Sequence, residues 1–341
     1  MPTPATTPPS PERIFDTLTA YQTSSALAAA VELDLFTHLA AGADTLGALA
    51  RATATTERGL RALCHLLTVR GFLAKSGERF RLAPDCAAFL DRRSPMFLGS
   101  MTGFLHGAGL RRHFEDAAAS VRRGGASEGG TTNPSDPVWI DFARAMGPAA
   151  RMMAGGVADV VLRGGTPRRV LDVAAGHGFY GIELAKRSTA TEVVSQDWEN
   201  VLTVARENAA AAGLGARWRG LAGSAFEVDF GAGFELVLLV NFLHHFEREA
   251  CVRLLSKARA ALADGGRVAV VEFRLDEERL SPAGSAAFDW TMLATTPRGQ
   301  AYTAGEYAGM FRAAELGTPE VHELPGGSHA VFLAPAPRAT R

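Results

Sequence analysis

The stretch that most constrains how this chain can fold is residues 168–187, RRVLDVAAGHGFYGIELAKR. It predicts a buried strand over residues 170–173, a turn of small residues over 174–178, and a helix that begins near Tyr180. Small side chains leave the backbone of such a turn uncovered, and the following helix points its free N–H groups at the same place. Strand and helix alternate again downstream, so the stretch predicts the first unit of a nucleotide-type α/β sheet.

The glycines of this turn do not by themselves identify a ligand. Gly176, Gly178 and Gly181 fit the G-x-G-x-x-G spacing of dinucleotide sites, but such a turn can also hold a phosphate or S-adenosylmethionine, or pack tightly without a ligand. Asp172 ends the strand four residues before the first glycine. A carboxylate there would repel a pyrophosphate but attract the ammonium group of a bound amino acid, which favours S-adenosylmethionine.

Residues 172–178 resemble motif I of the class I S-adenosylmethionine-dependent methyltransferases, D/E-x-G-x-G-x-G. Ala174 occupies the position of the first glycine of that motif, and its methyl group reduces the space next to the turn for a ligand. The resemblance implies S-adenosylmethionine as the cofactor and an α/β fold with a Rossmann-like seven-stranded sheet.

The next two strands are expected to bring further cofactor-binding residues to the same edge of the sheet. Asp197 follows a strand over residues 192–196, about where such folds place the carboxylate that binds ribose hydroxyls; it could also cap the next helix. Trp198 offers a flat face to adenine, or is a core aromatic residue. After a third strand, over residues 216–221, the resembling enzymes commonly place an acid near the adenine amino group, and this chain has Ser224 there.

A near-continuous apolar run over residues 234–240 predicts a strand buried on both faces, and Asn241 follows it. Together with the motif I resemblance, these positions give the expected cofactor-binding set: Asp172, Gly176, Gly178, Asp197, Trp198, Ser224, Ala225 and Asn241.

His244 is the candidate general base, because it follows this strand at the carboxyl edge of the sheet, where α/β sheets present ligands. A phenol has a pKa of about 10, so a neutral imidazole within hydrogen-bond distance would help to remove its proton. His245 should point the other way. Two adjacent histidines could equally be a local cap or a core contact.

The sequence around His244 is similar to the site of plant-type O-methyltransferases, where the base is a histidine followed by Asp-Trp; His245 replaces that aspartate here. In that family a glutamate on the next strand holds the imidazole, which implies Glu272 in that role, although Glu272 could also be a solvent-facing strand end. The family also has a second glutamate that brackets the histidine. Its position would fall near Ala301, whose side chain cannot hold an imidazole.

Residues 12–82 have the pattern of a winged helix: helices over 12–31, 33–39, 46–52 and 57–69, then a hairpin over 72–82. Such a module can bind DNA, but over residues 1–130 basic side chains exceed acidic ones by only two. Leucines would make the helix over 57–69 mostly core. A domain that packs and dimerises is therefore favoured, with no nucleic-acid partner.

Residues 33–84 resemble the N-terminal domain of small-molecule O-methyltransferases from plants and bacteria, which builds an intertwined homodimer. The resemblance implies a homodimer whose next region, a helix over residues 96–118, lines the acceptor pocket. We expect a tail over 1–10, a mostly helical winged-helix dimerisation and acceptor-lining domain over 11–130, and an S-adenosylmethionine-binding domain over 138–341. The boundary is expected in the polar, Gly-rich stretch 119–137, and a helix interrupted near Gly147-Pro148 should follow.

The composition excludes several other classes. A net charge of −1 provides no strong attraction to nucleic acid or to an anionic membrane, and no apolar run reaches membrane-spanning length. The first residues lack the basic start and apolar core of a signal peptide, and the three cysteines lack metal-site or disulfide spacing, so a reduced cytoplasm is expected. No metal is expected either, since His244 and His245 are adjacent and no cluster of ligands accompanies them.

The sequence thus predicts an S-adenosylmethionine-dependent O-methyltransferase that acts on a hydroxyl of a small aromatic or polyketide-like acceptor. Three alternatives stay open: methylation of nitrogen or carbon, a non-methylating reaction such as decarboxylation or hydroxylation, and a ligand-sensing winged-helix DNA-binding regulator.

Overall fold

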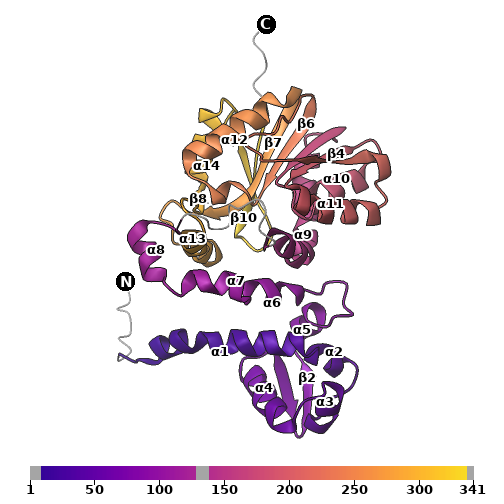
Figure 1. Cartoon of the computed structure of the whole chain (residues 1–341), viewed down its shortest axis with the longest axis vertical. Helices are drawn as coiled ribbons and strands as arrows, with labels where there is room; N and C mark the ends of the chain where they lie inside the picture. The colour runs from indigo at the N-terminus through magenta and orange to yellow at the C-terminus, as the bar shows by residue number, and fades with distance from the viewer. Residues whose placement is uncertain (1–8, 128–137, 336–341) are drawn as a thin grey trace, which may run out of the picture. The chain divides into compact units, whose positions relative to one another are not determined.

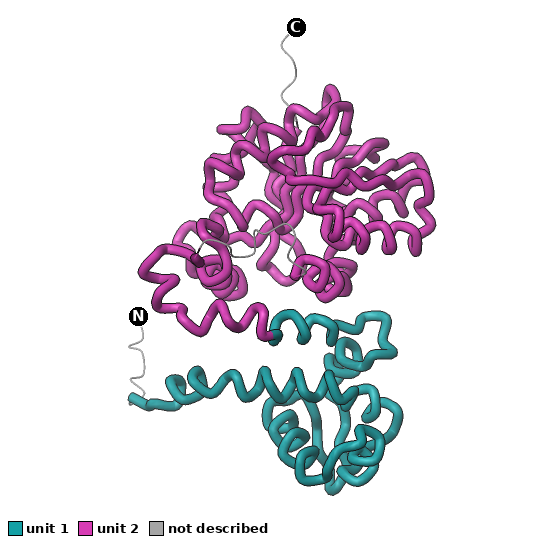
Figure 2. Tube along the Cα trace, viewed as in Figure 1, with its two compact units in different colours: residues 1–107 teal, residues 108–341 magenta. Residues whose placement is uncertain are grey.

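The computed structural model describes residues 9–127 and 138–335. The chain forms two compact units, one ending at Gly107 and the other beginning at Ala108 (Figure 2). This division falls earlier than the boundary expected within residues 119–137. The reason is that helix α8 (Ala117–Arg123) packs against α13 (Ala283–Thr295) and therefore belongs to the second unit.

The first unit has the predicted winged-helix order. Its elements are α1 (Glu12–Glu32), α2 (Leu35–Ala40), α3 (Leu46–Ala52), α4 (Glu57–Val69), the hairpin strands β1 (Leu73–Ser76) and β2 (Arg79–Leu82), α5 (Pro84–Phe89) and α6 (Ser100–Leu105). Side chains of Thr45 and Thr56 cap α3 and α4 by accepting backbone N–H groups, as expected for threonine at these positions. Leu60, Cys64 and Leu67 of α4 are buried in the core of this unit, so this helix is mostly core as predicted.

Two helix predictions were wrong. Residues 96–118 do not form one helix: α6 is followed by α7 (Ala108–Arg111), the 3₁₀ helix η1 (Arg112–Phe114) and then α8, which extends into the segment expected to be a loop. Gly107 lies at the first break, and Asp116 starts α8 anew by capping the Ala119 N–H. Conversely, α9 (Val138–Leu162) runs without interruption through Pro148, because it packs along α10 (Phe179–Arg187) and α11 (Glu199–Ala211).

The second unit is built on a mostly parallel sheet with the strand order β5-β4-β3-β6-β7-β10-β9 (Figure 1). The strands are β3 (Arg169–Val173), β4 (Glu192–Asp197), β5 (Trp218–Ala222), β6 (Phe234–Val240), β7 (Leu262–Leu275), β9 (Glu320–Glu323) and β10 (His329–Pro335). The seven predicted strands are confirmed, and a short eighth, β8 (Tyr302–Thr303), pairs with the end of β7. Only β10 runs antiparallel to both of its neighbours in this sheet. The pairing of β7 with β6 is irregular near its start, because it skips from Leu262 to Arg267.

Helices cover both faces of this sheet (Figure 1). One apolar core joins the sheet to α12 (Arg248–Ala260) and α14 (Ala304–Ala313), and the other joins it to α9 and α10. β6 is buried along almost its whole length, as its continuous apolar run predicts. With both faces covered, the carboxyl edge is where the parallel strands remain open to a ligand.

Gly181 lets α10 lie close to the sheet. A Cβ at this position would lie 2.7 Å from Cγ1 of Val193 and 3.1 Å from Oδ2 of Asp172, which is closer than ordinary packing permits. Its backbone N–H also donates to Asp172 Oδ2 at 3.2 Å. Gly181, the third glycine of the G-x-G-x-x-G spacing, is therefore required by the packing of α10 against the sheet.

We expect Gly181→Ala to lower the free energy of unfolding by about 1–3 kcal/mol, because the new methyl group overpacks the contact with Val193. Chemical denaturation measures the change. The matched control is Gly309→Ala in α14, where the nearest atom lies 3.5 Å from the added Cβ and stability should be kept or raised. Equal stabilities of the two variants would contradict this account of Gly181.

Candidate active site

Two residues other than glycine adopt left-handed backbone conformations at the carboxyl edge of neighbouring strands. Ala174 follows β3 with φ +51°, and Asn241 follows β6 with φ +51°. For alanine this conformation costs about 1–2 kcal/mol, while asparagine tolerates it better. Such residues cluster at functional sites, which marks this edge as the candidate site.

Asp172 lies beneath the turn and is 1% exposed. The pKa of Asp172 is raised to about 7, mainly by burial and to a lesser degree by the negative charge of Asp197, while the hydrogen bond from Gly181 opposes the rise. Its observed contact braces the start of α10. Attraction of an ammonium group by this carboxylate stays a prediction.

The two glycines of motif I have different surroundings. Gly176 has φ +55°, and a Cβ built on it would meet no atom within 4 Å, so the turn is open above this residue. Gly178 has φ +75°, and a Cβ there would lie 3.1 Å from the Cβ of Ala205 in α11. Gly176 therefore provides the open backbone to which a ligand could come close, and Gly178 permits close helix packing.

Asp197 joins the ends of β3 and β4. One carboxylate oxygen accepts the Gly176 N–H at 2.8 Å and the other accepts the Trp198 N–H at 2.7 Å. Burial raises the pKa of Asp197 to about 6, and these two hydrogen bonds oppose the rise. Trp198 lies at the start of α11 and packs against a buried cluster of Ala143, Val201 and Val204, so the core contact expected as an alternative is present.

The remaining expected cofactor residues follow β5 and β6. The Ser224 hydroxyl accepts the Phe226 N–H at 3.3 Å, and the carbonyl oxygen of Ala225 accepts a hydrogen bond from Lys257 at 3.0 Å. The side-chain oxygen of Asn241 lies 3.1 Å from Nε2 of His329 in β10. That contact joins residues 88 positions apart, and the sequence contained no signal for it.

His244 and Glu272 form a buried pair. Nδ1 of His244 lies 2.7 Å from Oε2 of Glu272, and the two residues are 4% and 0% exposed. The other carboxylate oxygen, Oε1, accepts the N–H groups of Phe242 at 2.8 Å and His244 at 3.3 Å. Glu272 is therefore not a solvent-facing strand end. With the Nδ1 proton donated to Glu272, the Nε2 lone pair is the acceptor of the ring.

Contrary to the expectation from the sequence, the His245 side chain does not point away from His244. The two rings lie 4.4 Å apart between centroids, because both residues belong to the 3₁₀ helix η3 (Leu243–His245), where successive side chains are about 120° apart rather than opposite. The His245 ring also meets Trp139 edge-on at 5.6 Å. Burial, and to a lesser degree the charge of His244, hold the pKa of His245 well below its usual range.

Aromatic rings surround the His244 imidazole. Phe288 of α13 lies edge-on to it at 4.7 Å, and Phe273 of β7 stacks on Phe288 at 3.7 Å. His329 lies 3.9 Å from Phe273, so these rings form a continuous row from His244 to Asn241. Phe273, Phe288 and His329 were not predicted as site residues from the sequence. Only Phe273 carried a signal, as the neighbour of Glu272 in β7.

Neither a metal centre nor a membrane span is found in residues 9–127 and 138–335. Within these ranges no group of three or more His, Cys, Asp or Glu side chains is placed to hold a metal ion. No helix there is both long and apolar enough to cross a membrane.

Comparison with known proteins gives two family matches. Residues 132–316 match the O-methyltransferase domain, and residues 15–92 match the O-methyltransferase dimerisation domain. A 3-hydroxy-5-methyl-1-naphthoate 3-O-methyltransferase of Streptomyces sahachiroi is 28% identical over 92% of this chain and 91% of its own.

Solved structures agree with this match. A protein of Nostoc punctiforme assigned as an O-methyltransferase is 42% identical, with a TM-score of 0.93 over 96% of this chain and 100% of its own. Human N-acetylserotonin methyltransferase, solved with S-adenosylmethionine, shares the fold at 20% identity, with a TM-score of 0.84 over 98% of this chain and 99% of its own.

The raised pKa of Asp172 predicts a pH-dependent stability. The folded state keeps a proton that the unfolded carboxyl loses above its ordinary pKa of 3.8, so the free energy of unfolding falls as the pH rises from there to about 7. We expect Asp172→Asn to raise that free energy at pH 8 by up to about 4 kcal/mol and to change it little at pH 4, since the amide oxygen can still accept the Gly181 N–H. Denaturation at the two pH values tests this, and a loss of stability at pH 8 would contradict it.

Proposed function

Because the chain belongs to the S-adenosylmethionine-dependent O-methyltransferases, we propose that it methylates a hydroxyl of a small aromatic, polyketide-like acceptor with His244 as the general base. The observation that carries the proposal is the contact between His244 Nδ1 and Glu272 Oε2. It leaves Nε2 as a proton acceptor in a site that is largely shielded from water.

Glu272 serves the base in two ways. Its carboxylate selects the tautomer that is protonated at Nδ1, and it stabilises the imidazolium that forms when Nε2 takes the proton of the acceptor hydroxyl. Two backbone N–H groups share the negative charge of the buried Glu272 carboxylate, so the carboxylate stays in place as the imidazole is protonated. His245, whose pKa is lowered, would stay neutral beside His244.

The residues at the carboxyl edge fit the cofactor. The open backbone at Gly176 admits a ligand, and Asp197 still has carboxylate lone pairs for ribose hydroxyls beside the two N–H groups it accepts. Ser224, Ala225 and Asn241 follow the adjoining strands and would complete the site, while Trp198 would face adenine along one edge. S-adenosylmethionine, when bound there, supplies the methyl group.

A planar aromatic acceptor suits the surroundings of His244. The stacked rings of Phe273 and Phe288 provide an apolar surface beside the imidazole, and aromatic rings favour such stacked or edge-on contacts. The Streptomyces relative named for a hydroxynaphthoate acts on a fused aromatic acceptor of this kind.

We also propose that the protein is a homodimer, which the match to a dimerisation domain supports. The N-terminal half of α1 has a stripe of exposed apolar side chains: Ile14, Phe15, Leu18 and Tyr21 are between 61% and 67% exposed. Their spacing places them on one face of the helix. An exposed apolar face of this size is typical of contact with another chain.

His244→Ala should lower turnover about 100-fold or more, because the acceptor hydroxyl loses its general base. Release of S-adenosylhomocysteine measures turnover, with 1-naphthol, 3-hydroxy-2-naphthoate and other phenols as acceptors. The variant should still bind S-adenosylhomocysteine in a calorimeter, since no cofactor residue is changed. His322→Ala in β9 is the matched control and should behave as the wild type.

Unchanged turnover in His244→Ala would refute base catalysis and favour nitrogen or carbon as the methylated atom. Consumption of an acceptor without release of S-adenosylhomocysteine would instead indicate a non-methylating reaction. Absence of S-adenosylhomocysteine binding in the wild type would refute the cofactor site.

Leu18→Glu should weaken dimerisation at least tenfold, because a charge would have to be buried in the apolar contact. Sedimentation velocity over a range of protein concentrations measures the dimer. Ala20→Glu adds the same charge on the other side of α1 and should leave the dimer intact. A wild type that sediments as a monomer at all concentrations would refute the proposal.

A further inference from the structure

The loop that carries His244 is in direct contact with a second segment, residues 299–303. The backbone N–H of Gln300 donates to the carbonyl oxygen of His244 at 2.9 Å, and the Tyr302 hydroxyl donates to the carbonyl oxygen of Phe246 at 2.6 Å. A Cβ on Gly299 would lie 2.4 Å from the same His244 oxygen. The position of this segment therefore determines where the carbonyl groups of the loop lie.

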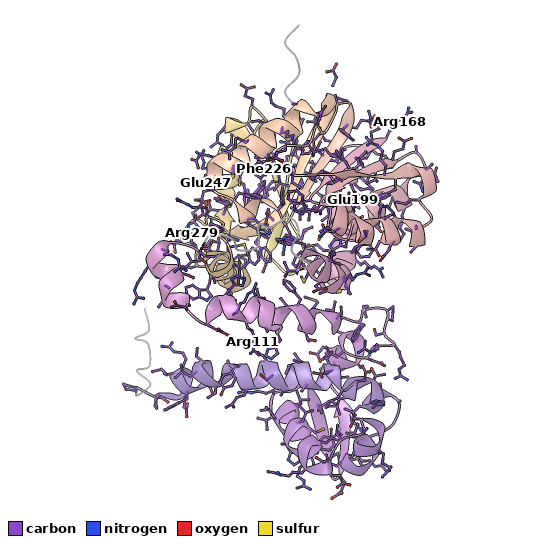
Figure 3. All side chains as sticks on the ribbon, viewed as in Figure 1. Arg111, Arg168, Glu199, Phe226, Glu247 and Arg279 are labelled. Carbon is purple, nitrogen blue, oxygen red and sulfur yellow. The ribbon has the colours of Figure 1, made fainter. Side chains whose placement is uncertain are left out.

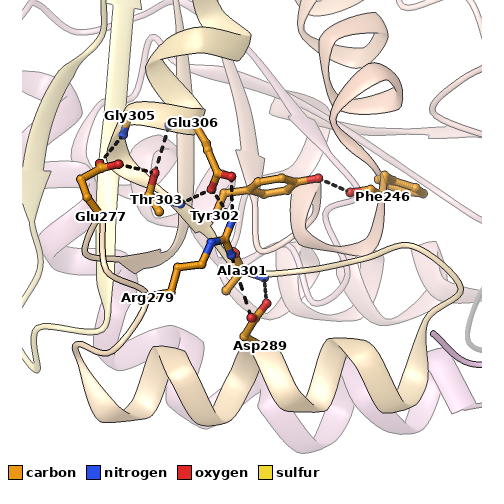
Figure 4. Close-up of polar contacts among 9 residues, drawn as sticks. All are labelled: Phe246, Glu277, Arg279, Asp289, Ala301, Tyr302, Thr303, Gly305 and Glu306. Carbon is orange, nitrogen blue, oxygen red and sulfur yellow. Dashed lines mark hydrogen bonds and ion pairs between the residues drawn. The ribbon is translucent and has the colours of Figure 1, made fainter. Parts of the chain in front are cut away.

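The segment is itself held mainly by side chains. Its only regular structure is β8, which pairs with the last two residues of β7. Asp289 of α13 accepts the Ala301 N–H at 2.7 Å, and Arg279 donates to the Ala301 carbonyl oxygen at 3.1 Å (Figure 4). Glu306 of α14 accepts the Thr303 N–H at 2.7 Å. Three charged side chains thus fix the backbone that contacts the His244 loop.

Arg279 belongs to the second unit, where Figure 3 labels it, and it lies at the centre of these contacts (Figure 4). Besides its bond to Ala301, its guanidinium lies 2.6 and 2.7 Å from the two carboxylate oxygens of Glu306 and 4.0 Å from Asp289. A planar guanidinium can donate in several directions at once, which a lysine ammonium on a flexible stem does less well. The backbone of Arg279 has φ +61°, and such a conformation persists in a non-glycine residue only when its surroundings fix it.

These contacts favour a role in positioning over a role in stability. The side chains of Arg279, Asp289 and Glu306 are 35%, 34% and 36% exposed, and ion pairs this exposed add little to stability. Asp289 is also the neighbour of Phe288, whose ring lies edge-on to the His244 imidazole. Arg279 therefore contacts the segment that bonds the His244 carbonyl oxygen, and its guanidinium lies 4.0 Å from Asp289 on the helix that carries Phe288.

We propose that Arg279 is a positioning residue for His244, acting through the backbone of residues 299–303. The inference rests on the proposed role of His244 as the general base. Arg279 would not touch the reacting atoms. It holds the carbonyl side of the His244 loop, while Glu272 holds the N–H side and the imidazole.

The test compares Arg279→Ala and Arg279→Lys with the wild type. Arg259→Ala is the matched control, because Arg259 is as exposed as Arg279 and pairs with a glutamate, Glu315, away from the His244 loop. For Arg279→Ala we expect kcat to fall about 10- to 100-fold, as a small misplacement of a base can cost this much. The KM for S-adenosylmethionine and the binding of S-adenosylhomocysteine should stay within twofold of the wild type. The kcat of Arg279→Lys should lie between those of Arg279→Ala and the wild type, and the kcat of Arg259→Ala should equal that of the wild type.

A second measurement does not depend on any acceptor. In protein labelled with ¹⁵N-histidine, the Nδ1 proton of His244, identified by its absence in His244→Ala, should exchange slowly with water because Glu272 accepts it. In Arg279→Ala this exchange should become at least tenfold faster, although Glu272 is unchanged. Arg279→Lys replaces Arg279→Ala in both measurements if the alanine variant does not fold.

Wild-type kcat and wild-type proton exchange in the Arg279 variants, measured well below their unfolding temperatures, would overturn the proposal. A lowered unfolding temperature with unchanged kcat would overturn it as well, since it would show a structural role alone. If His244→Ala keeps full turnover, the proposed function fails, and the proton exchange still reports whether Arg279 positions the imidazole.

Discussion

The candidate site depends on one buried carboxylate, Glu272, which has no exposed surface. A charge in such a place is stable only when it is fully hydrogen-bonded, and three donors surround it: the His244 ring and the N–H groups of Phe242 and His244. These donors all come from the loop after β6. The need to satisfy this one charge therefore gives an irregular loop a fixed shape next to β7.

A second constraint acts at the neighbouring strand ends. Asp172 and Asp197 are acids with raised pKa values, about 7 and about 6, and both are bound by N–H groups of the motif I turn and its helix. Ala174 adopts a left-handed backbone in the same turn. Backbone strain and buried acids thus lie together at the ends of β3 and β4, where we propose that the cofactor binds. Strained backbone conformations and buried acids with shifted pKa values lower the stability of a fold, and they are common where a ligand binds.

Much of this could be predicted from the sequence, because the signals were local. β6 was predicted residue by residue from one apolar run, and the burial of α4 was predicted from its leucines. The pairing of His244 with Glu272 followed from the family resemblance and from strand ends meeting at one edge. Contacts between distant segments, such as that of Asn241 with His329, could not be predicted, because no short sequence pattern encodes them. The left-handed backbone of Arg279 could not be predicted for the same reason, since it depends on tertiary packing. The breaks after α6 were missed although Gly107 and the capping residue Asp116 were local signals for them. The continuity of α9 through Pro148 was missed because tertiary packing decided against local propensity.

The loop that carries His244 is held through its backbone, and this explains how the site can lack a glutamate at position 301. Ala301 is fully buried and has no functional group in its side chain, yet both of its backbone polar groups are engaged, by Asp289 and by Arg279. Backbone groups in a buried segment must be paired whatever the side chain is, so residues 299–301 can contribute to the site with glycine and alanine among them. The loop that carries His244 is then held on its N–H side by the Glu272 carboxylate and on its carbonyl side by a segment whose own anchors are Asp289 and Arg279. An incomplete set of bracketing acids is for this reason compatible with a well-placed imidazole.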